Sequence, residues 1–476
     1  MTLTMQRPPI GSQALPIEFM NSHLRLLCVL ACLATAVPVY AAVAPAKPNV
    51  LLIVSDDHGY ADTGFQGSQD IATPHLDRLA ASGVRFTNGY VTHHFCSPTR
   101  AALMTGRYQQ RFGHERNPFY NPADHREGLP MSETLLPARL QPAGYVTGWI
   151  GKWHLGAAPE FAPGRRGFAE TYGFIGGGHR FREWTVNAAV EYQVPIERNG
   201  QPVERPEHLT PAFGEEAAAF VRRHANAPWF LYLAFNAPHT PHEPTPERLA
   251  RFATIKDPVR QKYAAQVSLL DDAIGTTMAA LRETGQERRT LVFFFSDNGG
   301  PVSVNGSLNT PLRGAKGSVY EGGVRVPFVV AWPERVAAAR TDDRPVSSVD
   351  VFATALAAAG VAMPTDRKYD SVNLIPYLTG EKSGAPHERL FWRNAALRAV
   401  REGNWKLVRG AGPADELYDL ANDVAETKNV ASAQPAVAGR LVAALDAWSQ
   451  ELVDPVFEGA GGRNAKAKKN AKKQQP

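Results

Sequence analysis

Two pairs of oxygen-donor side chains, Asp56-Asp57 and Asp297-Asn298, have the residue types of a metal site in this 476-residue sequence. Carboxylate and amide oxygens suit a hard cation such as Ca²⁺ or Mg²⁺, whereas zinc favours His and Cys ligands. Each pair alone is also common in turns, and Asp297-Asn298-Gly299-Gly300 is a strong turn signal. The two pairs therefore predict a cation site only if the fold brings them together.

The segment around Cys96 carries the second chemical signal. Ser97 and Pro98 predict a helix start, with Ser97 as N-cap and Pro98 at the first helical position, and Gly106 is the predicted stop. Cys96 would then lie just outside a helix N-terminus, where backbone amides favour anions and lower the pKa of a thiol. The alternative interpretation is an inert buried cysteine.

The elements that must position these residues are short apolar runs that alternate with helical stretches. Continuous apolar runs of this length suit strands buried on both faces, so the pattern predicts a doubly covered α/β sheet. The strand candidates are Asn49–Ser55, Tyr145–Ile150, Trp229–Phe235, Thr290–Ser296 and Pro327–Trp332, and the helix candidates are Thr73–Ser82, Pro258–Arg282 and Val349–Ala359.

Four of these strands end in polar clusters. The clusters are Asp56-Asp57-His58, Gly151-Lys152-Trp153-His154, Asn236-Ala237-Pro238-His239 and Asp297-Asn298-Gly299-Gly300. Open α/β sheets bind ligands beyond the carboxyl ends of their strands. We therefore expect the four clusters to converge on one site.

A second, smaller unit is predicted after Pro386. Short strands at Leu390–Trp392, Leu397–Arg401 and Trp405–Val408 precede a helix from about Gln434 to Leu452, which suggests an antiparallel α+β unit. The expected division is a catalytic domain over residues 46–380 and a smaller C-terminal domain over residues 386–457.

The N-terminus predicts export. Residues 20–42 read as a secretory signal with cleavage after Ala41, so residues 1–41 form a leader and signal peptide, and either Met1 or Met20 is the true start. A lipoprotein box ending at Cys32 is the alternative. Since Cys28 and Cys32 leave with the signal, Cys96 is the one cysteine expected in the mature protein. Periplasmic or secreted localisation follows, without stable membrane insertion, because no other run approaches about 20 apolar residues.

The charge is concentrated in a C-terminal tail. The net charge of the chain is +5, but the tail from Gly459 carries one arginine and five lysines, and the body is slightly acidic. We therefore expect no nucleic-acid partner. Residues 459–476 are predicted to be disordered and solvated, with loose attraction to anionic polymers or surfaces as the alternative.

Several motifs together resemble the type I sulfatases of the alkaline-phosphatase superfamily. Cys96-Ser97-Pro98-Thr99-Arg100 resembles their C-x-P-x-R signature, and Gly144–His154 is similar to their second signature. His239 and Lys316 follow in the family's order, and the likeness spans roughly residues 48–379. It implies an alkaline-phosphatase-like mixed sheet flanked by helices. Trp405-Lys406-Leu407 and Glu416–Leu420 resemble the family's smaller C-terminal domain.

The resemblance also implies the parts of the site. Cys96 would be oxidised to formylglycine by a formylglycine-generating enzyme, and one Ca²⁺ would be bound by Asp56, Asp57, Asp297, Asn298 and the modified Cys96. The hydrated aldehyde would attack sulfur and give a sulfated enzyme intermediate. Arg100, Lys152 and Lys316 would offset negative charge. His239 would be the general acid, and His154 the base that expels sulfate.

The implied function is hydrolysis of sulfate monoesters, of the kind acted on by arylsulfatases and N-acetylgalactosamine-6-sulfatase. Carbohydrate sulfates are the expected natural substrates, and aryl sulfates are expected to be cleaved too. Two alternatives remain at this point. One is a phosphonate monoester hydrolase or phosphodiesterase of the same superfamily, and the other is a secreted Ca²⁺-bearing module that only binds sulfated glycans.

Overall fold

Five parallel strands form the centre of the main sheet. In spatial order they are β9 (Thr290–Ser296), β1 (Asn49–Ser55), β8 (Trp229–Ala234), β4 (Val146–Lys152) and β5 (Glu170–Phe174). Every residue of β1, β8 and β9 is buried, as predicted for strands covered on both faces. The predicted strands agree closely with these bounds, except that β4 continues two residues further, to Lys152.

Outer strands, most of them in antiparallel pairings, complete a ten-stranded mixed sheet, in agreement with the predicted fold class. Beyond β9 lie β10 (Phe328–Ala331), β2 (Val84–Phe86) and β11 (Arg340–Asp342), and beyond β5 lie β6 (Glu197–Arg198) and β7 (Gln201–Pro202). A separate two-stranded sheet pairs β3 (Gly89–Tyr90) with β12 (Val346–Ser347).

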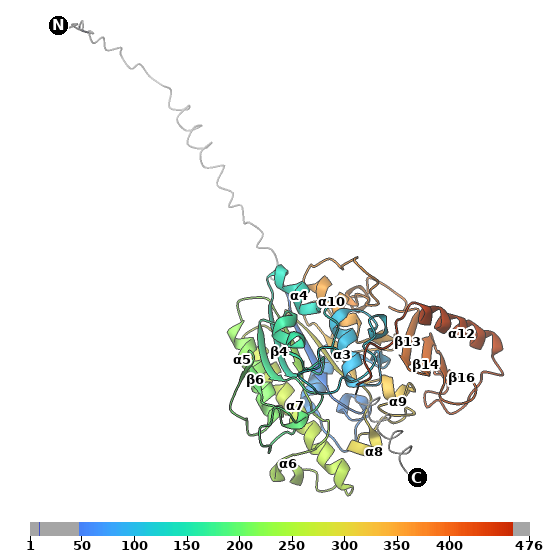
Figure 1. Ribbon diagram of the computed structural model, residues 1–476, viewed down its shortest axis with the longest axis horizontal. Helices are drawn as coiled ribbons and strands as arrows, with labels where there is room; N and C mark the ends of the chain where they lie inside the picture. The colour runs from blue at the N-terminus through green and yellow to red at the C-terminus, as the bar shows by residue number, and fades with distance from the viewer. Residues whose placement is uncertain (1–8, 10–46, 460–476) are drawn as a thin grey trace, which may run out of the picture. The chain divides into compact units, whose positions relative to one another are not determined.

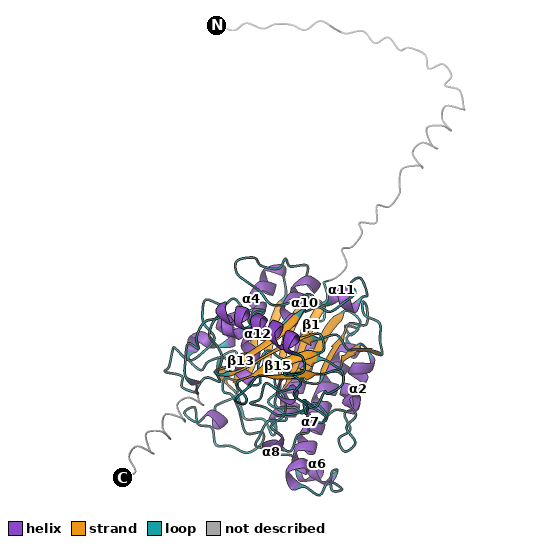
Figure 2. Cartoon of the chain, turned by 90° about the vertical axis from the view of Figure 1, so that its right-hand side faces the viewer, coloured by secondary structure: helices purple, strands orange, loops and turns teal. Residues whose placement is uncertain are grey.

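Helices cover both faces of the main sheet (Figures 1 and 2). Leu51 and Ile53 of β1 pack with α2 (Pro74–Ala81), α5 (Leu209–Arg223) and α7 (Pro258–Glu283). Val50, Leu52 and Val54 pack on the opposite side with α3 (Cys96–Thr105), α4 (Leu136–Leu140) and α10 (Asp350–Ala358). The alternation along one strand thus separates two hydrophobic cores.

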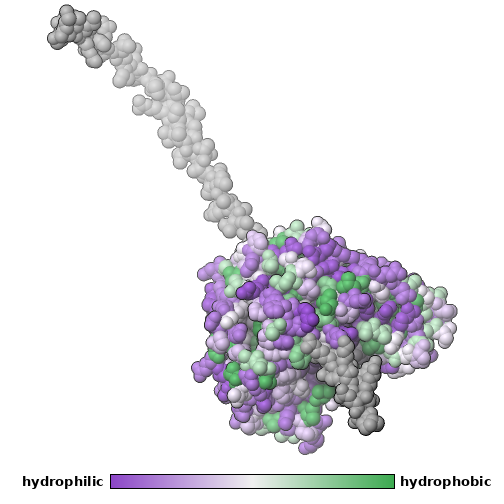
Figure 3. Space-filling model, in the orientation of Figure 1, coloured by the Kyte–Doolittle hydropathy of each residue, from purple (hydrophilic) through white to green (hydrophobic). Residues whose placement is uncertain are grey.

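The structure is a computed structural model that describes residue 9 and residues 47–459. The predicted signal segment and the tail beyond Gly459 lie outside the described residues. Within the described part of the chain, no helix is long and apolar enough to cross a membrane. Polar and apolar side chains are interspersed on the face drawn in Figure 3.

A four-stranded antiparallel sheet follows the main sheet along the chain. It consists of β13 (Arg389–Asn394), β14 (Leu397–Glu402), β15 (Trp405–Arg409) and β16 (Glu416–Asp419), and α12 (Pro435–Gln450) packs against it (Figure 1). Leu441, Leu445 and Trp448 of α12 share a core with Val400 and Leu407 of the strands. The predicted antiparallel α+β arrangement is therefore present.

The remaining short elements lie in the connections. They are α6 (Pro246–Ala250), α8 (Val302–Asn305), α9 (Glu321–Val324) and α11 (Ile375–Leu378), with 3-10 turns at Gly64–Gln66, Gln109–Arg111, Gln141–Ala143, Pro159–Phe161, Pro163–Arg166 and Glu191–Gln193.

The start of α3 corrects one prediction. The helix begins at Cys96 with Phe95 as N-cap, so Cys96 is its first residue and Ser97 is not the cap. The Ser97 hydroxyl instead bonds the His154 carbonyl at 2.5 Å and the His114 ring at 2.7 Å. The predicted stop is confirmed, because Gly106 is the left-handed C-cap with φ 71°.

Candidate active site

The four predicted clusters meet at one edge of the sheet. Asp56 and Asp57 follow β1, Asp297 and Asn298 follow β9, and His239 lies five residues beyond the end of β8. Lys152 is the last residue of β4, and His154 lies two residues further along the chain. Because β9, β1, β8 and β4 are parallel neighbours, their carboxyl ends share this edge. The N-terminus of α3 brings Cys96 to the same point.

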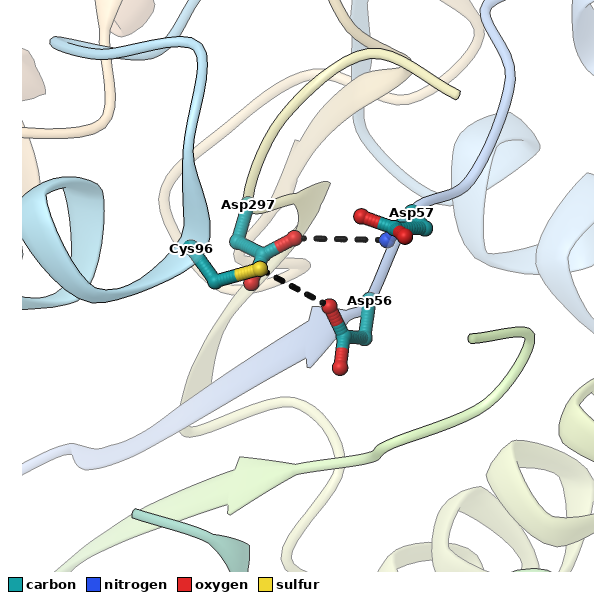
Figure 4. A group of neighbouring side chains, drawn as sticks. All are labelled: Asp56, Asp57, Cys96 and Asp297. Carbon is teal, nitrogen blue, oxygen red and sulfur yellow. Dashed lines mark hydrogen bonds between the residues drawn. The ribbon is translucent and has the colours of Figure 1, made fainter. Parts of the chain in front are cut away.

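Three carboxylates and the Cys96 thiol form the centre of the site (Figure 4). Asp56, Asp57, Asp297 and Cys96 each offer a ligand atom, and these atoms lie within 4.8 Å of one another. All four residues are buried. The Asp57 amide donates to Asp297 Oδ1 at 3.3 Å, and Cys96 Sγ donates to Asp56 Oδ1 at 3.4 Å.

Each carboxylate has its own cationic partner. Lys152 Nζ is 2.6 Å from Asp56 Oδ2, and Lys316 Nζ is 2.7 Å and 2.9 Å from the two oxygens of Asp57. The third pair joins Arg100 to Asp297, with Nη2 and Nε donating to Oδ2 at 2.7 Å and 3.0 Å. Burial alone lowers the pKa of Lys152 and of Lys316, but the neighbouring carboxylates outweigh it and raise both pKa values. Both lysines are therefore charged.

The donor set fits a hard divalent cation. Asn298 donates its amide nitrogen to Asp57 Oδ1 at 2.7 Å, which leaves Asn298 Oδ1 buried without a hydrogen-bond partner among the described residues. A buried acceptor without a partner is costly unless another group satisfies it. Three carboxylates and this amide oxygen are the ligand types that Ca²⁺ prefers.

The prediction of a lowered thiol pKa is wrong. Burial raises the pKa of Cys96 far above its usual range, and the negative charge of Asp297 adds to this shift, while Lys152 and Lys316 oppose it. An unmodified Cys96 is therefore protonated at neutral pH. Since the thiolate is the reactive form of cysteine, the thiol itself is a poor nucleophile here.

Both predicted histidines border the cluster in their neutral form. His154 has a left-handed backbone with φ 60°, and burial together with the charges of Lys152 and Arg100 holds its pKa well below the usual range. His239 Nε2 is 3.5 Å from Asp57 Oδ2, and its Nδ1 bonds the Thr240 carbonyl at 2.6 Å. Burial lowers the pKa of His239 to about 4, although Asp57 opposes the shift.

Three supporting residues were missed by the sequence analysis. Tyr232 accepts a hydrogen bond from Arg100 Nη1 at 3.0 Å, Asn305 donates to the Asp57 carbonyl at 3.1 Å, and Asn117 accepts from the Ser97 amide at 3.1 Å. Only Tyr232 lies in a predicted strand. Asn117 and Asn305 belong to loops and short elements in which the sequence contains no periodic signal.

Several other basic residues of the nearby loops bond groups outside the cluster. Both ring nitrogens of His179 bond backbone carbonyls, and His242 Nε2 bonds the Pro238 carbonyl at 2.9 Å. Arg180 pairs with Glu243. These contacts hold the surrounding loops.

A buried cluster of carboxylates and cations at the carboxyl edge of an α/β sheet is suited to holding a metal ion and an anionic ester. The sulfatase family model matches residues 48–361, and the model described as N-sulphoglucosamine sulphohydrolase, C-terminal, matches residues 315–450. The chain therefore belongs to the sulfatase family and is a sulfuric ester hydrolase that cleaves sulfate monoesters.

Individual relatives agree with this assignment. N-acetylgalactosamine-6-sulfatase of Mus musculus is 35% identical over 406 residues, which cover 80% of this chain and 75% of that protein. Steryl-sulfatase of Mus musculus is 34% identical over 451 residues, covering 78% and 71%. The crystal structure of Ps i-CgsB in complex with k-i-k-neocarrahexaose has a TM-score of 0.84 at 36% identity, covering 89% of this chain and 98% of that one.

Proposed function

We propose that this sulfatase removes sulfate from carbohydrates, and that Cys96 is converted to formylglycine beside one Ca²⁺ held by Asp56, Asp57, Asp297, Asn298 and the modified residue. Two relatives support the substrate class: one is named N-acetylgalactosamine-6-sulfatase, and the other was crystallised with a neocarrahexaose. The observation that carries the proposal is the convergence of the predicted carboxylates, cations and His239 around the buried Cys96.

A nucleophile can attack a sulfate ester only if positive groups offset the negative charge of the sulfate oxygens. When present, Ca²⁺ would supply such charge, and hydrated formylglycine would supply a hydroxyl nucleophile. Lys152 and Lys316 bind the sulfate oxygens, and Arg100 stabilises negative charge at residue 96. Each preorganised contact of this kind contributes about 3–4 kcal/mol to transition-state stabilisation.

The two histidines divide the proton transfers. His239 donates a proton to the leaving oxygen of the sugar, and the approach of an anionic sulfate raises its pKa and favours the protonated form. His154 is neutral, so it can accept a proton from residue 96. Together these transfers account for an acid and a base within one buried site.

Maturation and export belong to the same proposal. A formylglycine-generating enzyme modifies Cys96, and the segment ending at Ala41 directs the protein to the periplasm or the exterior. The catalytic domain spans residues 46–380 and the smaller domain residues 386–457.

Competing ester substrates test the reaction class. We expect turnover of nitrophenyl sulfate to exceed that of nitrophenyl phosphate and of a phenyl phosphonate ester, measured as kcat/KM on protein with known formylglycine content. Preferential phosphonate hydrolysis would instead establish the superfamily alternative.

A panel of natural sulfates tests the substrate class. Sulfated galactosamine and carrageenan oligosaccharides are compared with a steroid sulfate at equal enzyme concentration, with released sulfate as the readout. A higher kcat/KM on the sugars is expected, and a preference for the steroid sulfate would overturn the carbohydrate proposal.

A further inference from the structure

A loop over residues 176–193 borders the histidine side of the site; we call it the strap. It begins with the three glycines Gly176, Gly177 and Gly178 and ends in the 3-10 turn Glu191–Gln193. The hydroxyl of Tyr120 donates to the Ala188 carbonyl at 3.0 Å and fixes the middle of the strap. The mechanism above uses none of these residues.

The strap packs directly against His154. Glu191 Oε1 accepts a hydrogen bond from the Gly177 amide at 2.7 Å. Gly177 lies so close to His154 that a Cβ atom at this position would be 2.4 Å from His154 Nε2. The two ends of the strap are thus joined beside the histidine.

Tyr192 brings the strap to the second histidine. Its ring centroid lies 6.5 Å from that of His239. A Cβ atom at Gly178 would be 2.4 Å from Tyr192 Cζ and 2.5 Å from its hydroxyl oxygen, so the phenol occupies space that only glycine leaves open. None of the described residues accepts a hydrogen bond from this hydroxyl in the free protein.

The hydroxyl also lies within the field of the catalytic charges. Burial raises the pKa of Tyr192 to about 12, and the charges of Lys152, Asp56 and Lys316 act on it as well. The phenol therefore stays protonated at neutral pH and is a hydrogen-bond donor. A sulfate group bound by the two lysines offers oxygen acceptors to such a donor.

We infer that the Tyr192 hydroxyl donates a hydrogen bond to a sulfate oxygen of the substrate, on the side of the site formed by His154 and His239. Gly178 provides the space for the phenol, and Glu191 positions the glycine turn on which it packs. This inference rests on the sulfatase site proposed above and adds a residue that the family motifs do not include.

Tyr192→Phe tests the contact, because it keeps the ring and removes only the donor. We expect the KM for nitrophenyl sulfate and the Kd for inorganic sulfate to rise about tenfold, as for the loss of one hydrogen bond to a charged group. Sulfate binding is measured by calorimetry. Formylglycine content and unfolding temperature are expected to match the wild type.

The matched control is Tyr120→Phe. It removes the hydroxyl that bonds the same strap, but the charges of Lys152, Asp56 and Lys316 do not act on that hydroxyl. It is expected to bind sulfate like the wild type. An unchanged sulfate Kd in Tyr192→Phe, or an equal loss in Tyr120→Phe, would contradict the inference. Wild-type protein that binds sulfate but hydrolyses no sulfate ester would count against the proposed function instead, since calorimetry needs no turnover.

Gly178→Ala provides a second, independent test. In the wild-type background the new methyl group displaces the phenol, and sulfate affinity is expected to fall as in Tyr192→Phe. In a Tyr192→Ala background the space is free, so the same glycine substitution is expected to cause no further loss of sulfate affinity. Additive losses in the double variant would show that Gly178 and Tyr192 act separately.

Discussion

At the scale of single residues, the site is a balance of three buried carboxylates against three cations. The three cations differ in exposure to solvent. The side chains of Lys152 and Arg100 are fully buried, whereas that of Lys316 is 15% exposed. Lys316 also contacts Cys96 Sγ at 3.3 Å. It is therefore the cation best placed to meet an incoming sulfate group.

Substituting Lys316 by alanine tests this assignment. We expect kcat/KM for nitrophenyl sulfate to fall about 10²–10³-fold, because one preorganised charge contact is lost. The fold should persist, since Asp57 keeps its bond from Asn298. The control is Lys256→Ala at an exposed lysine, which is expected to leave kcat/KM unchanged. Equal activity in the two variants would rule out a catalytic role for Lys316.

At the scale of elements, strand ends and glycine turns orient the reacting groups. Gly177 shows this most clearly, because its missing side chain leaves room for the His154 ring. A methyl group there must push the ring or the strap aside.

Gly177→Ala is expected to reduce kcat about 10²-fold, since a displacement of about 1 Å at a reacting group can cost this much. The matched control is Gly164→Ala, where a Cβ atom would meet nothing within 4 Å. Both variants are assayed on nitrophenyl sulfate at equal formylglycine content. Wild-type kcat in Gly177→Ala would contradict the packing argument.

The sequence predicted the elements that carry strong periodicity. Buried strands such as β1 and β9 were predicted with their observed bounds. In both, a continuous apolar run is followed directly by an aspartate, which marks the end of the strand. Lys152, His154 and His239 were singled out because they follow predicted strands, whereas Lys316 was identified only through the order of the family motifs. Asn117, Tyr232 and Tyr192 were not found, since their roles depend on contacts between distant segments that no local pattern records.

The thiol pKa of Cys96 illustrates the same limit. A helix N-terminus lowers a thiol pKa through its dipole, and this much is visible in sequence. Full burial beside Asp56 and Asp297 reverses the shift, and both causes arise only in the folded chain.

The contact between α10 and the segment before β13 predicts a pH-dependent stability. His387 Nε2 is 2.8 Å and 2.9 Å from the two oxygens of Asp350. Burial lowers the pKa of His387, but Asp350 outweighs this effect and raises the pKa above the ordinary histidine value of 6.5. The folded protein binds this proton more tightly than the unfolded chain. Its stabilisation is therefore full below pH 6.5 and is lost as the pH rises through the folded pKa.

His387→Gln should remove this pH dependence. The measurement is the urea midpoint of wild type and variant, below pH 6.5 and well above the folded pKa. The difference between the two proteins is expected to be large at the lower pH and small at the higher one. His125→Gln, at a largely exposed histidine, serves as control. A difference that does not change with pH would contradict the linkage.

At the scale of the whole molecule, buried ion pairs fasten the four-stranded sheet to the catalytic core. Lys406 of β15 lies 2.8 Å from Glu321 of α9 and 3.0 Å from Glu426, and all three side chains are fully buried. Arg313, three residues before Lys316, donates to Tyr418 of β16 at 2.9 Å. The loop that carries Lys316 is therefore anchored on the C-terminal sheet.

Lys406→Met should destabilise the whole described fold. Removing Lys406 leaves the buried Glu426 without its ion-pair partner and Glu321 with Arg325 alone, and breaking such a buried pair typically costs about 3–5 kcal/mol. The free energy of unfolding is measured in guanidinium chloride, with the exposed Lys428→Met as control. An unchanged free energy of unfolding would contradict a stabilising role for these ion pairs.

The conversion of Cys96 is the central claim, and mass spectrometry of the tryptic peptide Phe86–Arg100 tests it most directly. Replacing the thiol by an aldehyde removes H₂S and adds oxygen, which gives a defined mass loss. Preparations with different degrees of conversion are assayed in parallel on nitrophenyl sulfate. Activity is predicted to rise in proportion to the converted fraction. Full activity in protein whose peptide retains an intact thiol would contradict the account.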